Sequence, residues 1–134
     1  MPGLYLLDTN TVSYIIKGTI PKVRARLAKV PMAQVAVSVV TEAELRFGLA
    51  RRPEAKQLRI AVEEFLLRVS VLPWDSKAAR EYGELRAGLE KSGTPVGNLD
   101  LMIAAHALST DGVLVTNDSA LRRIKRLKTE DWTR

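Results

Sequence analysis

The stretch LYLLDTN, residues 4–10, is a short apolar run that ends in an acid, Asp8. Such a run is typical of a strand buried on both faces, and it is far too short for a signal peptide or a membrane span. A second run, GVLVTND over residues 112–118, ends in Asp118 in the same way. In parallel sheets, ligands bind at the carboxyl ends of the strands, so both acids lie where a binding site is expected.

Segments with strand and helix patterns alternate between these two runs. We expect strands over residues 3–7, 35–39, 69–72 and 113–115 and an edge strand near 127–129, hence roughly five. We expect helices over residues 9–17, 21–30, 41–51, 54–68, 76–91 and 99–108, the third capped by Thr41 and the last by Asn98, and a short helix near the C-terminus. This alternation predicts a single three-layer α/β/α domain with a mainly parallel sheet.

The composition is that of a globular protein with an excess of positive charge. The chain has 134 residues, of which 46% are hydrophobic and 27% charged, and its formal net charge is +6. It has no Cys and one His, which excludes disulfides, thiolate zinc sites and Cys nucleophiles and disfavours His-based zinc sites. A basic surface suits a polyanionic substrate, although it also occurs in proteins that bind none. Because no basic region precedes Lys17, we expect the protein to be cytoplasmic.

Four acids lie at the ends of apolar segments: Asp8, Glu44, Asp100 and Asp118. Together they would form an all-oxygen pocket, which suits Mg²⁺ or Mn²⁺ better than zinc. Crowded carboxylates raise each other's pKa, whereas a divalent cation stabilises their ionised forms, so the pattern suggests a metal-dependent nuclease. Three of the acids have structural alternatives. Glu44 stands three residues after Thr41, as in a capping box, Asp100 is in the first turn of a helix, and Asp118 can form a turn or a cap.

Four motifs, LLDTN, TEAELRFG, GNLDLMIAAHAL and LVTND, occur in an order and spacing that resembles the PIN-domain ribonucleases, specifically the VapC toxins of bacterial toxin–antitoxin modules. The resemblance covers essentially the whole chain and implies a PIN-like fold and a Mg²⁺- or Mn²⁺-dependent endoribonuclease. It places Asp8, Glu44, Asp100 and Asp118 on the metal-binding, catalytic acids. Glu44 is preferred to the nearby Glu42 because it occupies the Glu of the family's E-L-x-x-G pattern.

The resemblance also implies polar residues that support the acids. Asn10, Thr116 and Asn117 match positions that hydrogen-bond the carboxylates or metal-bound water in the family. From the residues alone, turn and helix-cap roles account for them as well. The chain departs from the family at Leu121, where relatives often carry Phe, and this concerns packing more than chemistry.

The same resemblance implies a substrate and partners. The segments LKTEDWTR and GTPVGNLD are similar to those of the enteric VapC branch, which implies cleavage of tRNA, namely initiator tRNA in its anticodon loop. The family further implies a homodimer and a cognate VapB antitoxin that covers the acidic groove, with contact surfaces over residues 11–29 and 54–68. Arg46, Arg51 and Arg52 follow Glu44 on one helix and are expected to bind either RNA or the antitoxin.

Other features of the chain have structural interpretations. The basic run Arg122–Arg126 is either a second binding patch or an ordinary solvated face. His106, Trp74 and Trp132 are interpreted as structural residues. A phosphatase of the haloacid dehalogenase type would need a second Asp where this chain has Asn10. The remaining alternative is a catalytically inert PIN-fold module that binds RNA or a protein partner.

Overall fold

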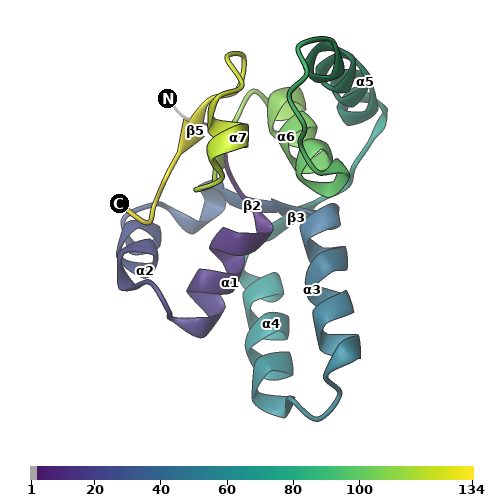
Figure 1. Ribbon diagram of the computed structural model, residues 1–134. Coiled ribbons are helices and arrows are strands. Elements are labelled where there is room, and N and C mark those ends of the chain that lie inside the picture. Colours follow the sequence, from purple (N-terminus) through teal and green to yellow (C-terminus); the bar gives the residue numbers. More distant parts are fainter. Residues whose placement is uncertain (1–2) are drawn as a thin grey trace.

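The computed structural model describes residues 3–134 and contains, in that part of the chain, one sheet of five strands in the order β3-β2-β1-β4-β5 (Figure 1). The strands are β1 (Tyr5–Leu7), β2 (Val35–Ser38), β3 (Ser70–Leu72), β4 (Val113–Val115) and β5 (Thr129–Glu130). Every pairing between neighbouring strands is parallel. The predicted fold class is confirmed, and the described sheet is parallel throughout.

Helices cover both faces of this sheet (Figure 1). They are α1 (Thr9–Lys17), α2 (Pro21–Ala28), α3 (Val39–Arg51), α4 (Lys56–Arg68), α5 (Ser76–Lys91), α6 (Asn98–Thr110) and α7 (Ser119–Arg122), with a 3₁₀ helix η1 (Met32–Gln34). Helices α1, α2 and α4 pack on one face, and α5, α6 and α7 pack on the other. Helices α3 and α4 form a hairpin that projects beyond the sheet (Figure 1).

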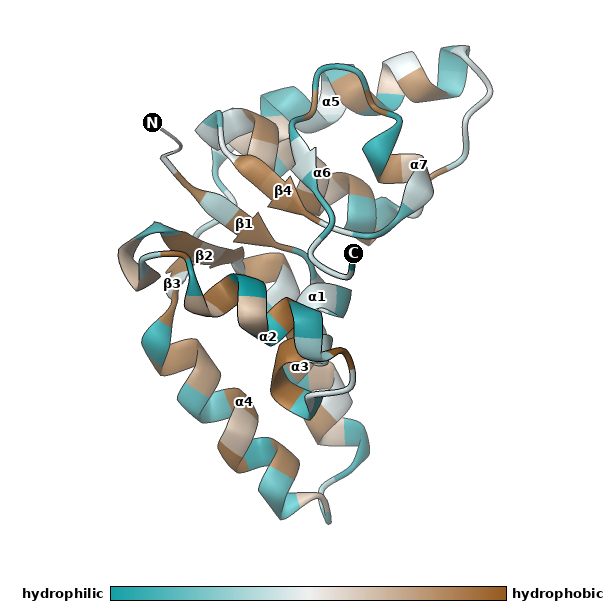
Figure 2. Ribbon diagram, turned by 90° about the vertical axis from the view of Figure 1, so that its left-hand side faces the viewer, coloured by the Kyte–Doolittle hydropathy of each residue, from teal (hydrophilic) through white to brown (hydrophobic). Residues whose placement is uncertain are grey.

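Each face of the sheet has its own hydrophobic core, because successive strand residues point to opposite faces. Leu6, Ala36 and Leu114 pack with α5, α6 and α7 on one face. Their neighbours in sequence, such as Leu7 and Val115, pack with α1, α2 and α4 on the other. All five are fully buried, and Figure 2 shows β1, β2 and β4 among the most hydrophobic segments. This burial on both faces explains the unbroken apolar runs in the sequence.

Two predicted helix caps are wrong. Helix α3 begins at Val39 rather than at Thr41, because Ser38 at the end of β2 accepts a hydrogen bond from the Val40 N–H at 3.0 Å. Helix α6 begins at Asn98 itself, and Gly97 takes the cap position without a side-chain hydrogen bond. A strand that passes directly into a helix uses its own last residue as the cap, and the sequence pattern of α3 did not reveal this junction.

The strand order reverses beside β1. The chain builds β2 and β3 on one side of β1 and then returns to build β4 and β5 on the other. Ligands bind at such a switch point, outside the carboxyl ends of the strands. Asp8 directly follows β1, and the segment after β4 leads to Asp118, so the fold brings both acids to this point. Among residues 3–134, no helix has the length and apolar character needed to cross a membrane.

Candidate active site

Asp8 lies at the base of the site and is only 4% exposed. Its Oδ1 accepts a hydrogen bond from the Thr11 N–H at 2.8 Å and so caps α1. Its own N–H donates to the Val115 carbonyl at 3.1 Å, which ties it to the end of β4. Burial raises the pKa of Asp8, and hydrogen bonds from Thr116 and Thr11 oppose that rise only in part. A nearby cation would favour the ionised form of such a carboxyl.

Asp118 caps the short helix α7, where its Oδ1 accepts a hydrogen bond from the Leu121 N–H at 3.0 Å. Its own N–H donates to the Thr116 hydroxyl at 3.0 Å. Thr116 is fully buried, and its side chain also hydrogen-bonds Asp8, where it lowers the pKa. Thr116 therefore links two of the four acids. Asn117 is exposed and donates to the Tyr14 hydroxyl at 3.3 Å.

Glu44 reaches the site from α3 and is held by threonines. The Thr9 hydroxyl donates to Glu44 Oε1 at 2.5 Å and lies 3.1 Å from the Thr41 hydroxyl. Since a hydroxyl has a single hydrogen, Thr9 must accept its second bond from Thr41. This chain of bonds connects Glu44 to the start of α1, next to Asp8. The sequence reasoning missed Thr9, because a threonine in the first turn of a helix carries no distinctive pattern.

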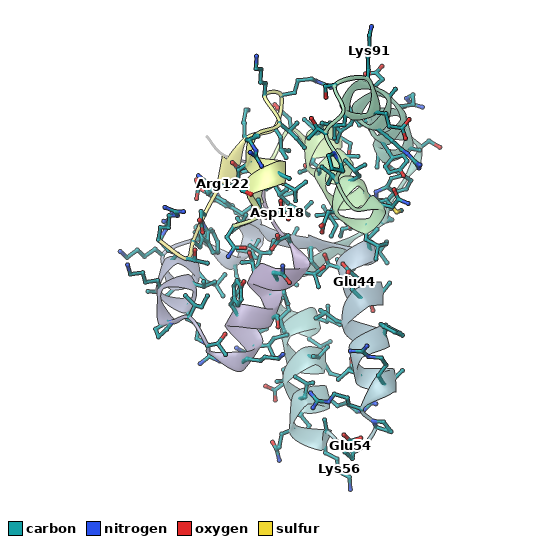
Figure 3. All side chains as sticks on the ribbon, viewed as in Figure 1. Glu44, Glu54, Lys56, Lys91, Asp118 and Arg122 are labelled. Atoms are coloured by element: carbon teal, nitrogen blue, oxygen red, sulfur yellow. The ribbon has the colours of Figure 1, made fainter. Side chains whose placement is uncertain are left out.

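Asp100 lies in the first turn of α6 and is partly buried. Its pKa is raised by burial and then by the charges of Asp118, Asp8 and Glu44. Carboxylates affect each other's ionisation in this way only when they are close, so the four predicted acids form one electrostatic group. Figure 3 shows Glu44 and Asp118 near the middle of the molecule, far from the tip of the α3–α4 hairpin.

The donor atoms of this group fit a hard divalent cation such as Mg²⁺, which prefers carboxylate oxygens. Within residues 3–134, however, no three acidic or histidine side chains converge closely enough to hold one ion as they stand. Asp8, Asp118 and Glu44 each have one oxygen engaged in a hydrogen bond to Thr11, Leu121 or Thr9. The donor chemistry of the group fits a divalent metal, although the cage is not preformed.

A groove of about 230 Å³ leads from Glu44 along α1 and α3. Asn10, Arg51 and Arg52 are among the residues that line it. Arg46 does not line this groove, since its guanidinium pairs with Glu42 at 2.7 Å and with Glu63 at 3.2 Å and joins α3 to α4. The hydrogen bonds that Arg46 donates to Glu63 and Glu42 raise its pKa. Two of the three predicted arginines therefore face the groove.

A buried pair, Ser38 and His106, joins the helices that carry Glu44 and Asp100. His106 Nδ1 lies 2.8 Å from Ser38 Oγ, and both residues are at most 2% exposed. Ser38 Oγ also accepts a hydrogen bond from the Val40 N–H at 3.0 Å, so one hydroxyl bonds both the start of α3 and the imidazole of α6. Burial lowers the pKa of His106, as expected for a neutral ring. This pair was not predicted, because the cap of α3 had been placed at Thr41.

The fold and the site together define a parallel α/β domain with four coupled carboxylates at its switch point, an arrangement suited to divalent-metal chemistry. Residues 5–127 match the PIN domain family. Similar curated proteins include the tRNA(fMet)-specific endonuclease VapC of Shigella flexneri, which is 36% identical over 96% of this chain and 98% of that protein. The Ribonuclease VapC2 of Haemophilus influenzae (strain ATCC 51907 / DSM 11121 / KW20 / Rd) is 38% identical over 96% of this chain and 97% of its own. The chain therefore belongs to the PIN-domain family, as a VapC ribonuclease of the VapBC toxin–antitoxin type.

Solved structures support the same assignment. The crystal structure of DNA-bound VapBC from Salmonella typhimurium matches with a TM-score of 0.89 and 37% identity, over 96% of this chain and 98% of that one. VapBC2 from Rickettsia felis, bound to a DNA fragment from its promoter, matches with a TM-score of 0.87 and 34% identity over the same shares of the two chains. The predicted family is confirmed.

Proposed function

We propose that this chain is a Mg²⁺- or Mn²⁺-dependent endoribonuclease in which Asp8, Glu44, Asp100 and Asp118 hold the metal. The observation that carries the proposal is the electrostatic coupling of Asp100 to the other three acids, at the carboxyl ends of β1 and β4. Uncompensated carboxylates in one place reduce stability, so a cation is the simplest reason for the chain to assemble them.

The protein's own groups would have distinct tasks in hydrolysis of a phosphodiester bond. A bound divalent metal lowers the pKa of a water molecule and stabilises the attacking and leaving oxygens. The helix caps position Asp8 and Asp118, and Thr116 bonds the Asp8 carboxyl and the main chain of Asp118. Thr9 and Thr41 orient Glu44. Asn10 lines the groove and would hydrogen-bond substrate or water. Asn117 would support the site indirectly, by its hydrogen bond to the Tyr14 hydroxyl.

The proposed substrate is tRNA, with the initiator tRNA anticodon loop as the preferred site. The names of similar proteins from Shigella flexneri and Salmonella typhimurium, tRNA(fMet)-specific endonuclease VapC, support this choice. Cleavage of that substrate would stop translation in the cytoplasm. Arg51 and Arg52 would contact phosphates next to the cleaved bond, since they line the groove that begins at Glu44.

The proposed partner is a VapB antitoxin, because similar solved structures are VapBC complexes. A hollow of about 300 Å³ between α1, α2 and α4 offers an apolar docking surface with a charged rim. The apolar lining is supplied by Ile15, Ile16, Leu27, Met32 and Phe65.

We further propose a homodimer within the toxin–antitoxin complex, supported by exposed apolar side chains on α4, where Leu67 is 86% and Ile60 52% exposed. Light scattering on the purified chain would measure this as twice the 14.8 kDa monomer mass.

The nuclease proposal is tested with antitoxin-free protein on total tRNA and on purified initiator tRNA, with Mg²⁺ and with EDTA. The informative variant is Asp8→Asn, which keeps a side chain that can cap α1. Its matched control is Asp111→Asn, because Asp111 is exposed and precedes β4, at the opposite edge of the sheet from the acids. We expect one cut in the anticodon loop, abolished by EDTA and by Asp8→Asn but not by Asp111→Asn.

Other outcomes separate the parts of the proposal. Metal-dependent cleavage of another RNA would keep the mechanism and reject the tRNA assignment. If no RNA is cleaved in a metal-dependent way by protein shown to be free of antitoxin, the proposal is wrong and the inert binding module becomes the better interpretation.

A further inference from the structure

A second groove, of about 550 Å³, lies on the α7 side of the site between the turn that follows α5 and the segment over residues 120–126. We call it the α7 groove. One wall begins at the helix that Asp118 caps. The other wall, formed by residues 92–95, leads directly into α6, whose first turn carries Asp100. Both walls are therefore continuous in sequence with an acid of the proposed active site.

The charges along the α7 groove are of one sign. Arg123, Lys125 and Arg126 line it, and no acidic residue does. Arg126 is already paired with Glu81 at 2.7 Å, whereas Arg123 and Lys125 form no ion pair within residues 3–134. The two unpaired cations are exposed, so their charge is available to a ligand in the groove.

This basic segment is not a loose solvated run. Leu121, Ile124 and Leu127 recur at every third position and are 1%, 8% and 6% exposed, all in the core beneath α7. The intervening residues must therefore face outward, which sets Arg123 and Lys125 at defined places on the rim of the groove. A pair of cations with fixed positions discriminates among ligands better than a mobile tail does.

We propose that the α7 groove binds the phosphodiester backbone of the RNA on one side of the bond that is cleaved at the acids. This inference rests on the proposed nuclease function and adds the direction in which the strand leaves the site. The acids repel the phosphates that flank the cleaved bond, so separate cations are needed to hold them. Arg123 and Lys125 meet that need on the α7 side, opposite Arg51 and Arg52 on the α3 side.

The chemistry of the lining favours a nucleic acid over a protein segment. The cations Arg123 and Lys125 supply the free donors of the groove, because the Ser92 hydroxyl donates to the Leu89 carbonyl at 3.1 Å and the Thr94 hydroxyl pairs with Ser92 Oγ. Arginine and lysine side chains bind phosphate oxygens without reading sequence. The large apolar side chains that would anchor a protein helix gather instead in the hollow between α1, α2 and α4.

The test measures RNA binding separately from cleavage. Fluorescence anisotropy of labelled initiator tRNA is recorded over a salt series with antitoxin-free Asp8→Asn protein, with and without Arg123→Ala and Lys125→Ala. The matched control is Lys77→Ala with Arg80→Ala, since these exposed cations lie at the far end of α5 and also form no ion pair within residues 3–134. A charge-preserving pair, Arg123→Lys with Lys125→Arg, reports whether charge or packing matters.

We expect the groove variant to weaken binding about tenfold and to reduce the salt slope of log Kd by about 1.4, since each single-strand phosphate contact contributes about 0.7. The control and the charge-preserving pair should bind as the parent does. With Asp8 restored, the groove variant should raise KM and leave kcat unchanged.

Unaltered tRNA affinity and salt slope in the groove variant would overturn the inference. Loss of antitoxin binding with unaltered RNA binding would assign the groove to a protein. The binding assay is decisive even if the wild type cleaves nothing, which would count against the nuclease proposal alone.

Discussion

Burial raises the pKa of Asp100, and the charges of Asp118, Asp8 and Glu44 raise it further. No hydrogen bond opposes this rise. A carboxyl with a raised folded-state pKa binds its proton more tightly in the native chain than in the unfolded chain. The free energy of unfolding therefore falls as the pH rises from the ordinary carboxyl pKa of 3.8 through the folded-state pKa. At neutral pH, the metal-free protein bears the full cost of this ionisation.

From this we expect Asp100→Asn to unfold a few degrees above the wild type at neutral pH without metal, and at the same temperature in acid below the ordinary carboxyl pKa. Addition of Mg²⁺ or Mn²⁺ should stabilise the wild type and have little effect on the variant. Thermal unfolding followed by circular dichroism measures both effects. Equal stabilisation of the two proteins by metal would contradict the role given to Asp100.

Thr9 determines how Glu44 is held, because it is the donor to Glu44 Oε1. We expect Thr9→Val to reduce metal-dependent cleavage about tenfold or more, as is typical when a group that orients a metal ligand is lost. Thr9→Ser keeps the hydroxyl and should retain activity near the wild-type level. The comparison of kcat/KM at several Mg²⁺ concentrations provides the measurement. A Thr9→Val enzyme as active as Thr9→Ser would show that Glu44 needs no such support.

The start of α3 depends on Ser38, which accepts from the Val40 N–H and shares a hydrogen bond with His106 Nδ1. Ser38→Ala removes the cap and leaves two buried polar atoms without a partner. We expect a loss of about 1–3 kcal/mol in the free energy of unfolding. Urea denaturation measures it, with the exposed Ser92→Ala as control. A loss no greater than that of the control would mean that the cap is replaced by another group.

His106 adds a pH dependence to the same junction. Because burial lowers its folded-state pKa below the ordinary 6.5, the unfolded chain binds the proton more readily than the native chain does. The stability of the junction is therefore complete above 6.5 and decreases as the pH falls below that value. His106→Gln should unfold with a flatter pH dependence over this interval, as measured by urea denaturation at a series of pH values. Parallel pH curves for the variant and the wild type would contradict this role.

In the assembled fold, the hollow between α1, α2 and α4 is the proposed antitoxin surface. Met32 lines it and is 40% exposed in the free chain. Since burial of a methionine side chain contributes about 1.5–3 kcal/mol, we expect Met32→Gln to weaken antitoxin binding about tenfold. Isothermal titration with the purified antitoxin is the measurement. Ala87→Gln, on the exposed side of α5 over the other face of the sheet, is the control and should bind normally.

The apolar runs were sufficient to predict the parallel strands and most helices, because burial on both faces forces a strand to be apolar along its length. Helix α5 has the predicted bounds of Ser76–Lys91, and α1 those of Thr9–Lys17. The starts of α3 and α6 were wrong, since a helix cap depends on which side chain is free to bond the first N–H groups. Ser38 ends a strand and starts a helix, a double role that a linear pattern does not separate.

The acids at the ends of apolar segments could be recognised without a structure, and their spacing matches a PIN-domain VapC protein. The tertiary structure alone reveals that the charges of Asp118, Asp8 and Glu44 act on Asp100, because that depends on distances between residues up to 110 positions apart. It also decided that Arg46 is committed to Glu42 and Glu63, and that Thr9 orients Glu44. Strand burial is a local requirement that each segment meets with its own residues. Electrostatic coupling and hydrogen-bond pairing depend on the way the sheet order returns β4 to the side of β1, and no single segment contains that information.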